Sequence, residues 1–300
     1  MCISAICRIG RLSLISSLLL ITLWPAPVAT AGITTNTSAA ADKMKPEEVV
    51  AKHLESIGTS EARTAVRSRA MVGTSVATFR IKGINQTQGR VVIASEGVKN
   101  LMAMAFATTE YPAEKIGFDG KTVTANYQRP GQYSVLGNFL LGNKIVSKEG
   151  LLGGSLSAAW PLLDLKEKNP HLNYAGSTKS NDRRLHKLEY LPRGGSDLRI
   201  TLFFDSENFQ HVRTEYQRQV TGQMGNTPEA SSRQSQSRYS MTEEFSDFKQ
   251  ENGLTLPHTY KLQLKILTQN SSFDADWVAQ LSQFIFNGVI DAKEFNVAAD

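Results

Sequence analysis

Apolar and polar positions follow two different periods along this chain, which divide it into a short helical start and a long extended remainder. Val50, Leu54 and Ile57 recur at helical spacing behind Pro46, a residue suited to the first turn of a helix. From about residue 70, runs of β-branched and aromatic residues follow one another with turn residues between them. The pattern therefore predicts one or two helices, the first ended by Gly58 and a short second one from Ser60, and then many strands in sequence.

Short turn sequences join the predicted strands. Asp119-Gly120 stands between two extended pieces, and Glu251-Asn252-Gly253 stands between two others. Consecutive strands joined by short turns pair as antiparallel neighbours. The expected fold class is therefore mainly β (α+β), built on one antiparallel sheet. The segment 277–291 fits a helix or a strand by period alone, and its neighbours favour a strand.

Residues 136–165 follow neither period. This stretch is rich in Leu, Gly and Ala, but Lys144, Lys148 and Glu149 interrupt it too often for a membrane-spanning helix, which needs about 20 apolar residues in a row. We expect it to form short helices that lie against one face of the sheet. Its glycines are expected to act as hinges: Gly142, Gly150, Gly153 and Gly154.

Soft apolar side chains gather in this stretch and on one predicted strand face. Methionine and leucine repack easily and suit varied apolar ligands, but the same residues equally suit a packed core, and the sequence leaves both interpretations open. The candidate ligand-binding residues of an apolar cavity are Met102, Met104, Phe106, Leu140, Leu141, Leu151, Leu152, Trp160, Leu162 and Leu163.

The first 31 residues have the pattern of a cleavable secretory signal peptide. Arg8 and Arg11 precede the apolar run 12–24, and Ala29 and Ala31 occupy the small-residue positions before a cleavage site. An uncleaved anchor is the alternative, which the short apolar run disfavours. We expect a flexible leader over 32–44 and a single domain over 45–300, with a mobile Gly-, Ser- and Gln-rich loop at 221–238.

Cysteine usage and charge refine this picture. Cys2 and Cys7 both lie in the predicted signal peptide, so neither supplies a lipid-attachment cysteine at the cleavage site. An exported chain without disulfides is typical of the bacterial periplasm, and we expect a periplasmic or secreted location without a transmembrane anchor. The net charge of +5 is spread along the chain, whereas nucleic-acid binding needs a clustered basic face, so we expect no nucleic-acid partner.

Catalytic and metal-binding signatures are missing from the sequence. It contains no H-E-x-x-H, G-x-S-x-G or phosphate-loop motif, and its five histidines are scattered without zinc-ligand spacing. Glu243 and Glu244 are adjacent, so a strand would direct them to opposite faces and keep them from forming a carboxylate pair. We therefore expect no enzyme activity, no catalytic residues, no metal site and no cofactor.

Four stretches together carry a family resemblance: "EEVVAKHLESIG" (47–58), "FDGKTV" (118–123), "FFDSENFQHVRTEYQ" (203–217) and "QENGLTLPHTYKL" (250–262). In the order of its elements, the chain resembles the LolA/LolB-like outer-membrane lipoprotein-sorting-like proteins over about residues 46–295. The resemblance implies a strongly curved antiparallel sheet or unclosed half-barrel, with short helices in its concave face. It also implies binding of acyl chains or lipidated proteins between sheet and helices.

Three functional hypotheses follow from these features. The first is a periplasmic, non-enzymatic carrier or binder of lipid acyl chains or lipoproteins, with a lipid acyl chain or lipidated protein as its partner. The second is a cell-envelope protein-interaction scaffold with a filled interior. The third and weakest is a secreted hydrolase, which would require His186 or His211 to meet a serine and a carboxylate in one pocket.

Overall fold

The computed structural model of the chain describes residues 44–81, 83, 85–220 and 237–298. All of these residues belong to one compact unit, residues 41–300. The predicted signal peptide, almost all of the predicted leader and residues 221–236 of the predicted loop therefore lie outside the described residues. The last two residues of that loop, 237–238, begin a strand.

Two helices open the described chain, both where the sequence predicts them. In α1 (Pro46–Ile57) the side chain of Glu48 accepts a hydrogen bond from the backbone N–H of Lys45 at 3.0 Å, which satisfies one donor at the helix start. Gly58 ends the helix and donates its N–H to the carbonyl of Leu54. The short α2 (Ser60–Ala65) leads into the sheet.

Twelve strands form the main sheet, and two short ones form a separate hairpin. The hairpin consists of β6 (Tyr127–Arg129) and β7 (Gln132–Tyr133). The main sheet consists of β1 (Ser68–Phe79), β2 (Asn85–Glu96), β3 (Lys99–Phe106), β4 (Ala113–Phe118), β5 (Val123–Ala125), β8 (His171–Ser180), β9 (Arg183–Leu191), β10 (Arg199–Asp205), β11 (His211–Val220), β12 (Ser237–Glu251), β13 (Leu254–Leu267) and β14 (Ser272–Phe286).

Every pairing in the main sheet is antiparallel, as the short turns predict. The order is β5-β4-β3-β2-β1-β14-β13-β12-β11-β10-β9-β8, so each strand lies beside a sequence neighbour except where β1 meets β14. In the described residues β5 and β8 do not pair with each other, so the sheet stays open. The expected mainly β class and the unclosed half-barrel are confirmed, and the strand assignment for the C-terminal segment is confirmed by β14.

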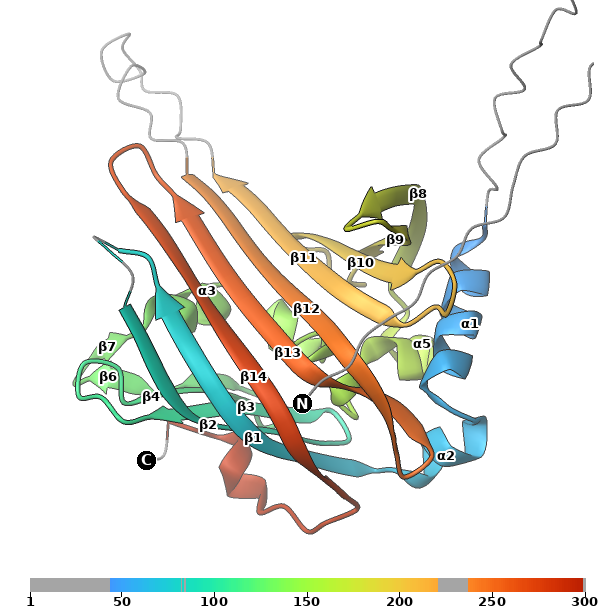
Figure 1. The fold of residues 1–300 in the computed structure, drawn as a ribbon, viewed down its shortest axis with the longest axis horizontal. Helices are drawn as coiled ribbons and strands as arrows, with labels where there is room; N and C mark the ends of the chain where they lie inside the picture. Colours follow the sequence, from blue (N-terminus) through green and yellow to red (C-terminus); the bar gives the residue numbers. More distant parts are fainter. Residues whose placement is uncertain (1–43, 82, 84, 221–236, 299–300) are drawn as a thin grey trace, which may run out of the picture. The chain divides into compact units, whose positions relative to one another are not determined.

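The segment Val135–Lys168, named here the inner segment, covers one face of the sheet. Figure 1 shows its helices behind the long strands β11 to β14. The expectation of short helices against one sheet face is therefore confirmed. The elements of the inner segment are α3 (Val135–Gly142), α4 (Ile145–Lys148), the 3-10 turns η1 (Gly154–Leu156) and η2 (Pro161–Asp164), and α5 (Leu165–Lys168).

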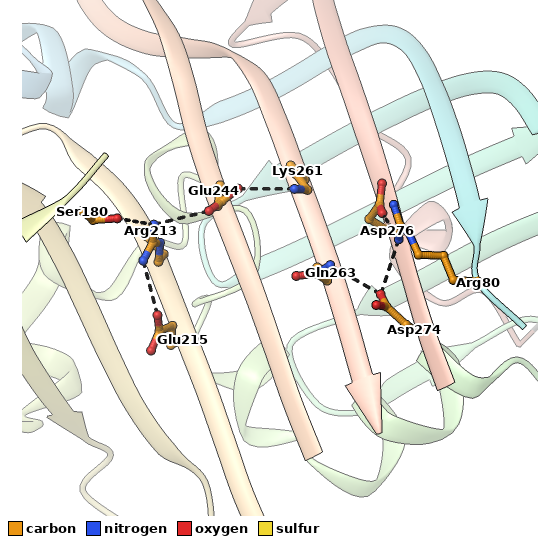
Figure 2. A network of polar contacts seen from close by, with 9 residues as sticks. All are labelled: Arg80, Ser180, Arg213, Glu215, Glu244, Lys261, Gln263, Asp274 and Asp276. Carbon is orange, nitrogen blue, oxygen red and sulfur yellow. Dashed lines mark hydrogen bonds and ion pairs between the residues drawn. The ribbon is translucent and has the colours of Figure 1, made fainter. Parts of the chain in front are cut away.

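The opposite, outer face carries cross-strand polar contacts, drawn in Figure 2. Glu244 on β12 contacts Arg213 on β11 at 3.5 Å and Lys261 on β13 at 3.6 Å. Arg80 forms an ion pair with Asp276 of β14 in the same way. Partly exposed pairs of this kind contribute about 0–1 kcal/mol each, so they keep this face polar more than they stabilise the sheet.

The end of the described chain covers another part of the outer face. The 3-10 turn η3 (Ala292–Phe295) packs on β3 and β4, where the ring of Phe295 is fully buried beside Ala94 and Leu101. The backbone N–H of Val297 donates to the hydroxyl of Thr124 at 3.0 Å. This strap closes a second, small core that the sequence pattern did not predict.

Candidate functional site

Polar side chains of the sheet hold the backbone of the inner segment. The guanidinium of Arg69 on β1 donates to the carbonyl of Ser155 at 2.7 Å. The hydroxyl of Ser95 on β2 accepts from the N–H of Ala158 at 2.8 Å. The amide of Asn100 on β3 donates to the carbonyl of Ser147. The carboxyl of Glu243 on β12 accepts from the N–H of Gly153. Side chains of β1, β2, β3 and β12 thus hold the backbone of residues 147–158 in a fixed position.

Two glycines of the inner segment are required by geometry. Gly150 has φ +76°, and a Cβ there would lie 2.0 Å from the carbonyl oxygen of Ala159. Gly154 has φ +51°, and its Cβ would lie 2.8 Å from the ring of His211. Left-handed backbone and such close approach both exclude larger residues. The structure therefore gives these positions a fixed packing role, while the expected hinge role stays a prediction.

Glu243 is a fully buried carboxyl group in the middle of the inner face. Its oxygens accept hydrogen bonds from the hydroxyl of Tyr216 at 2.6 Å, the hydroxyl of Tyr260 at 2.8 Å and the N–H of Gly153 at 2.7 Å. Burial raises the pKa of Glu243 to about 7, although these three donors lower it. Glu244 points to the outer face, so the expected opposite orientation of the two carboxylates is confirmed.

A buried aromatic cluster joins α1 to the inner segment. The indole N–H of Trp160 donates to Nε2 of His53 at 3.1 Å, while Nδ1 of His53 lies 3.1 Å from the carbonyl of Phe209. His211 stacks on Trp160 at 4.7 Å between ring centroids. Burial lowers the pKa of His53 to about 4 and holds the pKa of His211 well below its ordinary value, so both rings are neutral at pH 7.

The ten residues proposed from the sequence as a ligand-binding set come together in this core. Eight of them are buried in one cluster, and Leu141 and Leu163 are partly buried against it. Only a gap of about 10 Å³ lies beside Met102 and Leu152. In this arrangement their partners are one another and the sheet, and contact with a ligand stays a prediction.

Open space lies instead at one end of the inner face. A cleft of about 970 Å³ opens where β1 ends, β2 begins and α3 starts, between the loop after β3 and the β6–β7 hairpin. Its apolar lining includes Phe79, Tyr111, Leu136, Phe273 and Trp277. None of the ten proposed residues lines it. Its size is within the range of small-molecule sites, about 300–1,000 Å³.

A chain of hydrogen bonds runs beneath the wall of this cleft. The indole N–H of Trp277 donates to the hydroxyl oxygen of Tyr111 at 3.0 Å, and that hydroxyl donates to Glu114 at 2.5 Å. Ser134, which caps the start of α3, donates to the second oxygen of Glu114 at 2.8 Å. Burial raises the pKa of Glu114 to about 7, against the lowering effect of Tyr111 and Ser134.

Exposed apolar side chains lie on the cleft lining or against a lining residue. Ile81, Tyr127 and Val135 are each 40–51% exposed, and the ring of Tyr127 stacks on Tyr133 at 4.4 Å. Ile81 follows β1, the two tyrosines belong to the β6–β7 hairpin, and Val135 begins α3. Apolar groups at a cleft opening are typical of a site that exchanges apolar ligands with its surroundings.

Sequence reasoning missed the residues of this cleft because they come from separate parts of the chain. Phe79, Tyr111, Ser134 and Trp277 are each isolated in sequence, and their meeting depends on β1 lying beside β14. The one local signal is "YPAE" (111–114), which places a tyrosine and a glutamate three positions apart at a strand start.

Among the described residues, no catalytic constellation for the hydrolase hypothesis forms at the two histidines that it named. Nδ1 of His186 lies 3.0 Å from the hydroxyl of Tyr174, and Nε2 of His211 lies 2.9 Å from the hydroxyl of Thr214. His211 is fully buried in the core. Neither ring is hydrogen-bonded to both a serine and a carboxylate, as the nucleophilic mechanism would require.

Among the described residues, none of the helices combines the length and the apolar character needed to cross a bilayer. No family model and no curated protein matches the sequence.

Solved structures do match the chain. They include an outer-membrane lipoprotein-sorting protein domain from Vibrio parahaemolyticus (11% identity, TM-score 0.43, covering 85% of this chain and 99% of that one). A LolA superfamily protein from Nitrosomonas europaea is similar at 11% identity and TM-score 0.42, covering 83% and 97%. A DUF1329 family protein from Desulfovibrio piger is similar at 8% identity and TM-score 0.40, covering 85% and 99%. Structures described as lipoprotein-sorting or LolA superfamily proteins are thus among those similar to this chain, at 11% identity.

Proposed function

We propose that this protein is a non-enzymatic periplasmic binder or carrier of an acyl chain or a similar apolar ligand, which enters the cleft at the end of the inner face. The observation that carries the proposal is the cleft itself: about 970 Å³ of space with aromatic and aliphatic walls, beside an otherwise packed interior. Export by the predicted signal peptide accounts for the periplasmic part of the proposal. A lipidated protein is the larger partner that the sequence resemblance implies.

The energetics of an acyl ligand are adequate. Each buried methylene contributes about 0.8 kcal/mol, so about 15 methylenes contribute roughly 12 kcal/mol. Association costs at least about 4 kcal/mol. The remainder of roughly 8 kcal/mol corresponds to micromolar affinity. One chain that fills the cleft is therefore enough for a working carrier.

The ten core residues enter the proposal as the interior end of the site. Leu136 lines the cleft and belongs to the same core cluster as Leu140 and Met104. A longer ligand would reach them if α3 moved away from β4 and β5. The rest of the inner segment is held by four sheet side chains, so we propose that movement is confined to α3 and that residues 147–158 stay in place.

A scaffold role is the second candidate, and one observation favours it. The middle of the inner face is filled, with Trp160 and Leu140 at 1% and 0% exposure. A filled interior suits a protein that presents its surface to cell-envelope partners. The two candidates differ in whether the end cleft takes up an apolar ligand.

Native mass spectrometry of protein purified from the periplasm of its own cells tests the proposal. We expect a co-purifying lipid mass that disappears after delipidation, and saturable binding of the neutral fluorophore N-phenyl-1-naphthylamine afterwards. A protein that carries no lipid and does not bind the fluorophore would favour the scaffold.

A further inference from the structure

The cleft is walled by aromatic rings arranged around one another. Phe79 meets Tyr111 edge to face at 4.9 Å and Trp277 edge to face at 6.0 Å between ring centroids. Tyr133 and Phe273 also line the space. The faces of aromatic rings carry negative potential and attract organic cations, by about 0.5–2 kcal/mol each.

The carboxylates of the cleft add to this potential. Glu110 lies at the exposed rim, where Thr108 donates to it at 2.5 Å; this hydrogen bond and, to a smaller extent, the charge of Arg129 lower its pKa. Glu110 and Arg129 thus bring one negative and one positive charge to the lining. Glu114 is the remaining charged group of the lining, and its contacts are the hydroxyl groups of Tyr111 and Ser134.

Glu114 acts from behind the wall. It is fully buried, so its charge acts on the cleft through a medium of low dielectric constant, where electrostatic effects are strong. The hydrogen bonds run from Trp277 to Tyr111 to Glu114, so the electron density of the two rings is increased by the carboxylate behind them. Glu114 is thus a positioning residue for the aromatic wall.

We propose that the cleft selects ligands that carry an organic ammonium group beside their apolar body, held against the rings of Phe79, Tyr111 and Trp277 above the buried carboxyl group of Glu114. This inference rests on the proposed function and names the ligand class of the same site. The cleft is expected to disfavour plain fatty acids, because their negatively charged carboxylate would face a wall of negative potential.

Three ligands with the same decyl chain test the selectivity: decyltrimethylammonium, undecanoate and the uncharged decyl maltoside, each below its micelle concentration. Each displaces N-phenyl-1-naphthylamine from the delipidated protein at about one pH unit above the Glu114 pKa of about 7. We expect decyltrimethylammonium to bind about tenfold more tightly than undecanoate, a difference of about 1.4 kcal/mol. Decyl maltoside should lie between them.

Glu114→Gln is the decisive variant, and Glu244→Gln on the outer face is its matched control. We expect Glu114→Gln to reduce the ammonium-to-carboxylate ratio to about threefold or less, a change of about 0.7 kcal/mol, with decyl maltoside affinity unchanged. The control should keep the full ratio. If Glu114→Gln fails to fold, the wild-type protein decides: its ratio should fall when the pH is lowered to about one unit below the Glu114 pKa.

The remaining outcomes separate the two proposals. Undecanoate binding as tightly as the ammonium ligand, or a ratio that neither Glu114→Gln nor pH changes, overturns the ligand class and leaves the cleft as a general apolar site. Failure of all three decyl ligands and of the fluorophore to bind overturns the proposed function itself.

Discussion

The indole N–H of Trp160 donates a hydrogen bond to Nε2 of His53, 3.1 Å away and 107 positions earlier in the chain. The contact joins the inner segment to α1, and both residues are buried. It fixes the tautomer of His53, whose Nδ1 then carries the proton and donates to the carbonyl of Phe209. The inner segment is thereby part of the folded core.

Removing this hydrogen bond should destabilise the protein measurably. Trp160→Phe keeps an aromatic ring but leaves Nε2 of His53 buried without a donor, which costs about 1–3 kcal/mol of the free energy of unfolding. Urea denaturation measures the loss. A double-mutant cycle with His53→Leu should give a coupling energy of at least about 0.5 kcal/mol. Strictly additive effects would show that the two residues act independently.

The buried carboxyl group of Glu243 should make stability depend on pH. Its pKa is raised from 4.5 to about 7 in the folded state, so the native protein holds this proton more tightly than the unfolded chain does. The stabilisation is present below about pH 4.5 and is lost as the pH rises through 7. Glu243→Gln removes this titration, and relative to wild type it should gain about 3 kcal/mol between pH 5 and pH 8.

Glu244→Gln is the neighbouring control for this pH series, because its side chain lies partly exposed on the outer face. Its stability relative to wild type should stay constant within about 0.5 kcal/mol over the same range. Urea denaturation at both pH values provides the comparison. An equally flat difference for Glu243→Gln would mean that Glu243 titrates as an ordinary carboxyl group.

Gly150→Ala should be far more harmful than Gly142→Ala. The added methyl group at Gly150 meets the carbonyl oxygen of Ala159 at 2.0 Å and the backbone there has positive φ, whereas nothing lies within 4 Å of a Cβ at Gly142. We expect a loss of about 2 kcal/mol or more for Gly150→Ala and a change within about 1 kcal/mol for Gly142→Ala. Thermal unfolding of both variants checks this. Similar melting temperatures would contradict the fixed role of Gly150.

Arg69→Met should stabilise the protein. The guanidinium is buried at 1% exposure, and although it donates to Ser155, its Nε and Nη2 have no hydrogen-bond partner. Burial lowers the pKa of Arg69 to about 10, which reflects the cost of keeping this charge out of water. Methionine of similar length removes that cost and should raise the free energy of unfolding by about 1 kcal/mol or more. A fall in the urea midpoint would mean that the hydrogen bond to Ser155 outweighs the buried charge.

Much of the fold is predictable from the sequence because local patterns determine it. Pro46 and Gly58 delimit α1, and Asp119-Gly120 joins β4 to β5 as expected. The pairing of β1 with β14 is not local, and no turn sequence announces it. The strand β8 and the C-terminal strap around Phe295 were likewise not predicted, since the first has mixed burial and the second gains its partners only in the folded protein.

The site was predictable only in part for the same reason. Apolar residues such as Leu152 and Trp160 are buried in the core, but composition does not distinguish a cavity wall from a packed core. Open space is the result of packing, and it lies where Tyr111 and Trp277 meet from distant strands. A buried glutamate such as Glu114 has no sequence signature, because its burial depends on that same meeting.

The most direct test of apolar-ligand binding in the cleft is to measure how a neutral apolar fluorophore binds to a folded variant. Val135→Asp places a charge on the cleft lining at the first position of α3, where a carboxylate suits the helix dipole and the fold is kept. Val289→Asp, at a fully exposed position, is the control. If the cleft is the apolar-ligand site, we expect Val135→Asp to weaken binding of N-phenyl-1-naphthylamine by about tenfold or more, while Val289→Asp binds as wild type does. Equal binding by all three proteins, or none by the wild type, would contradict it.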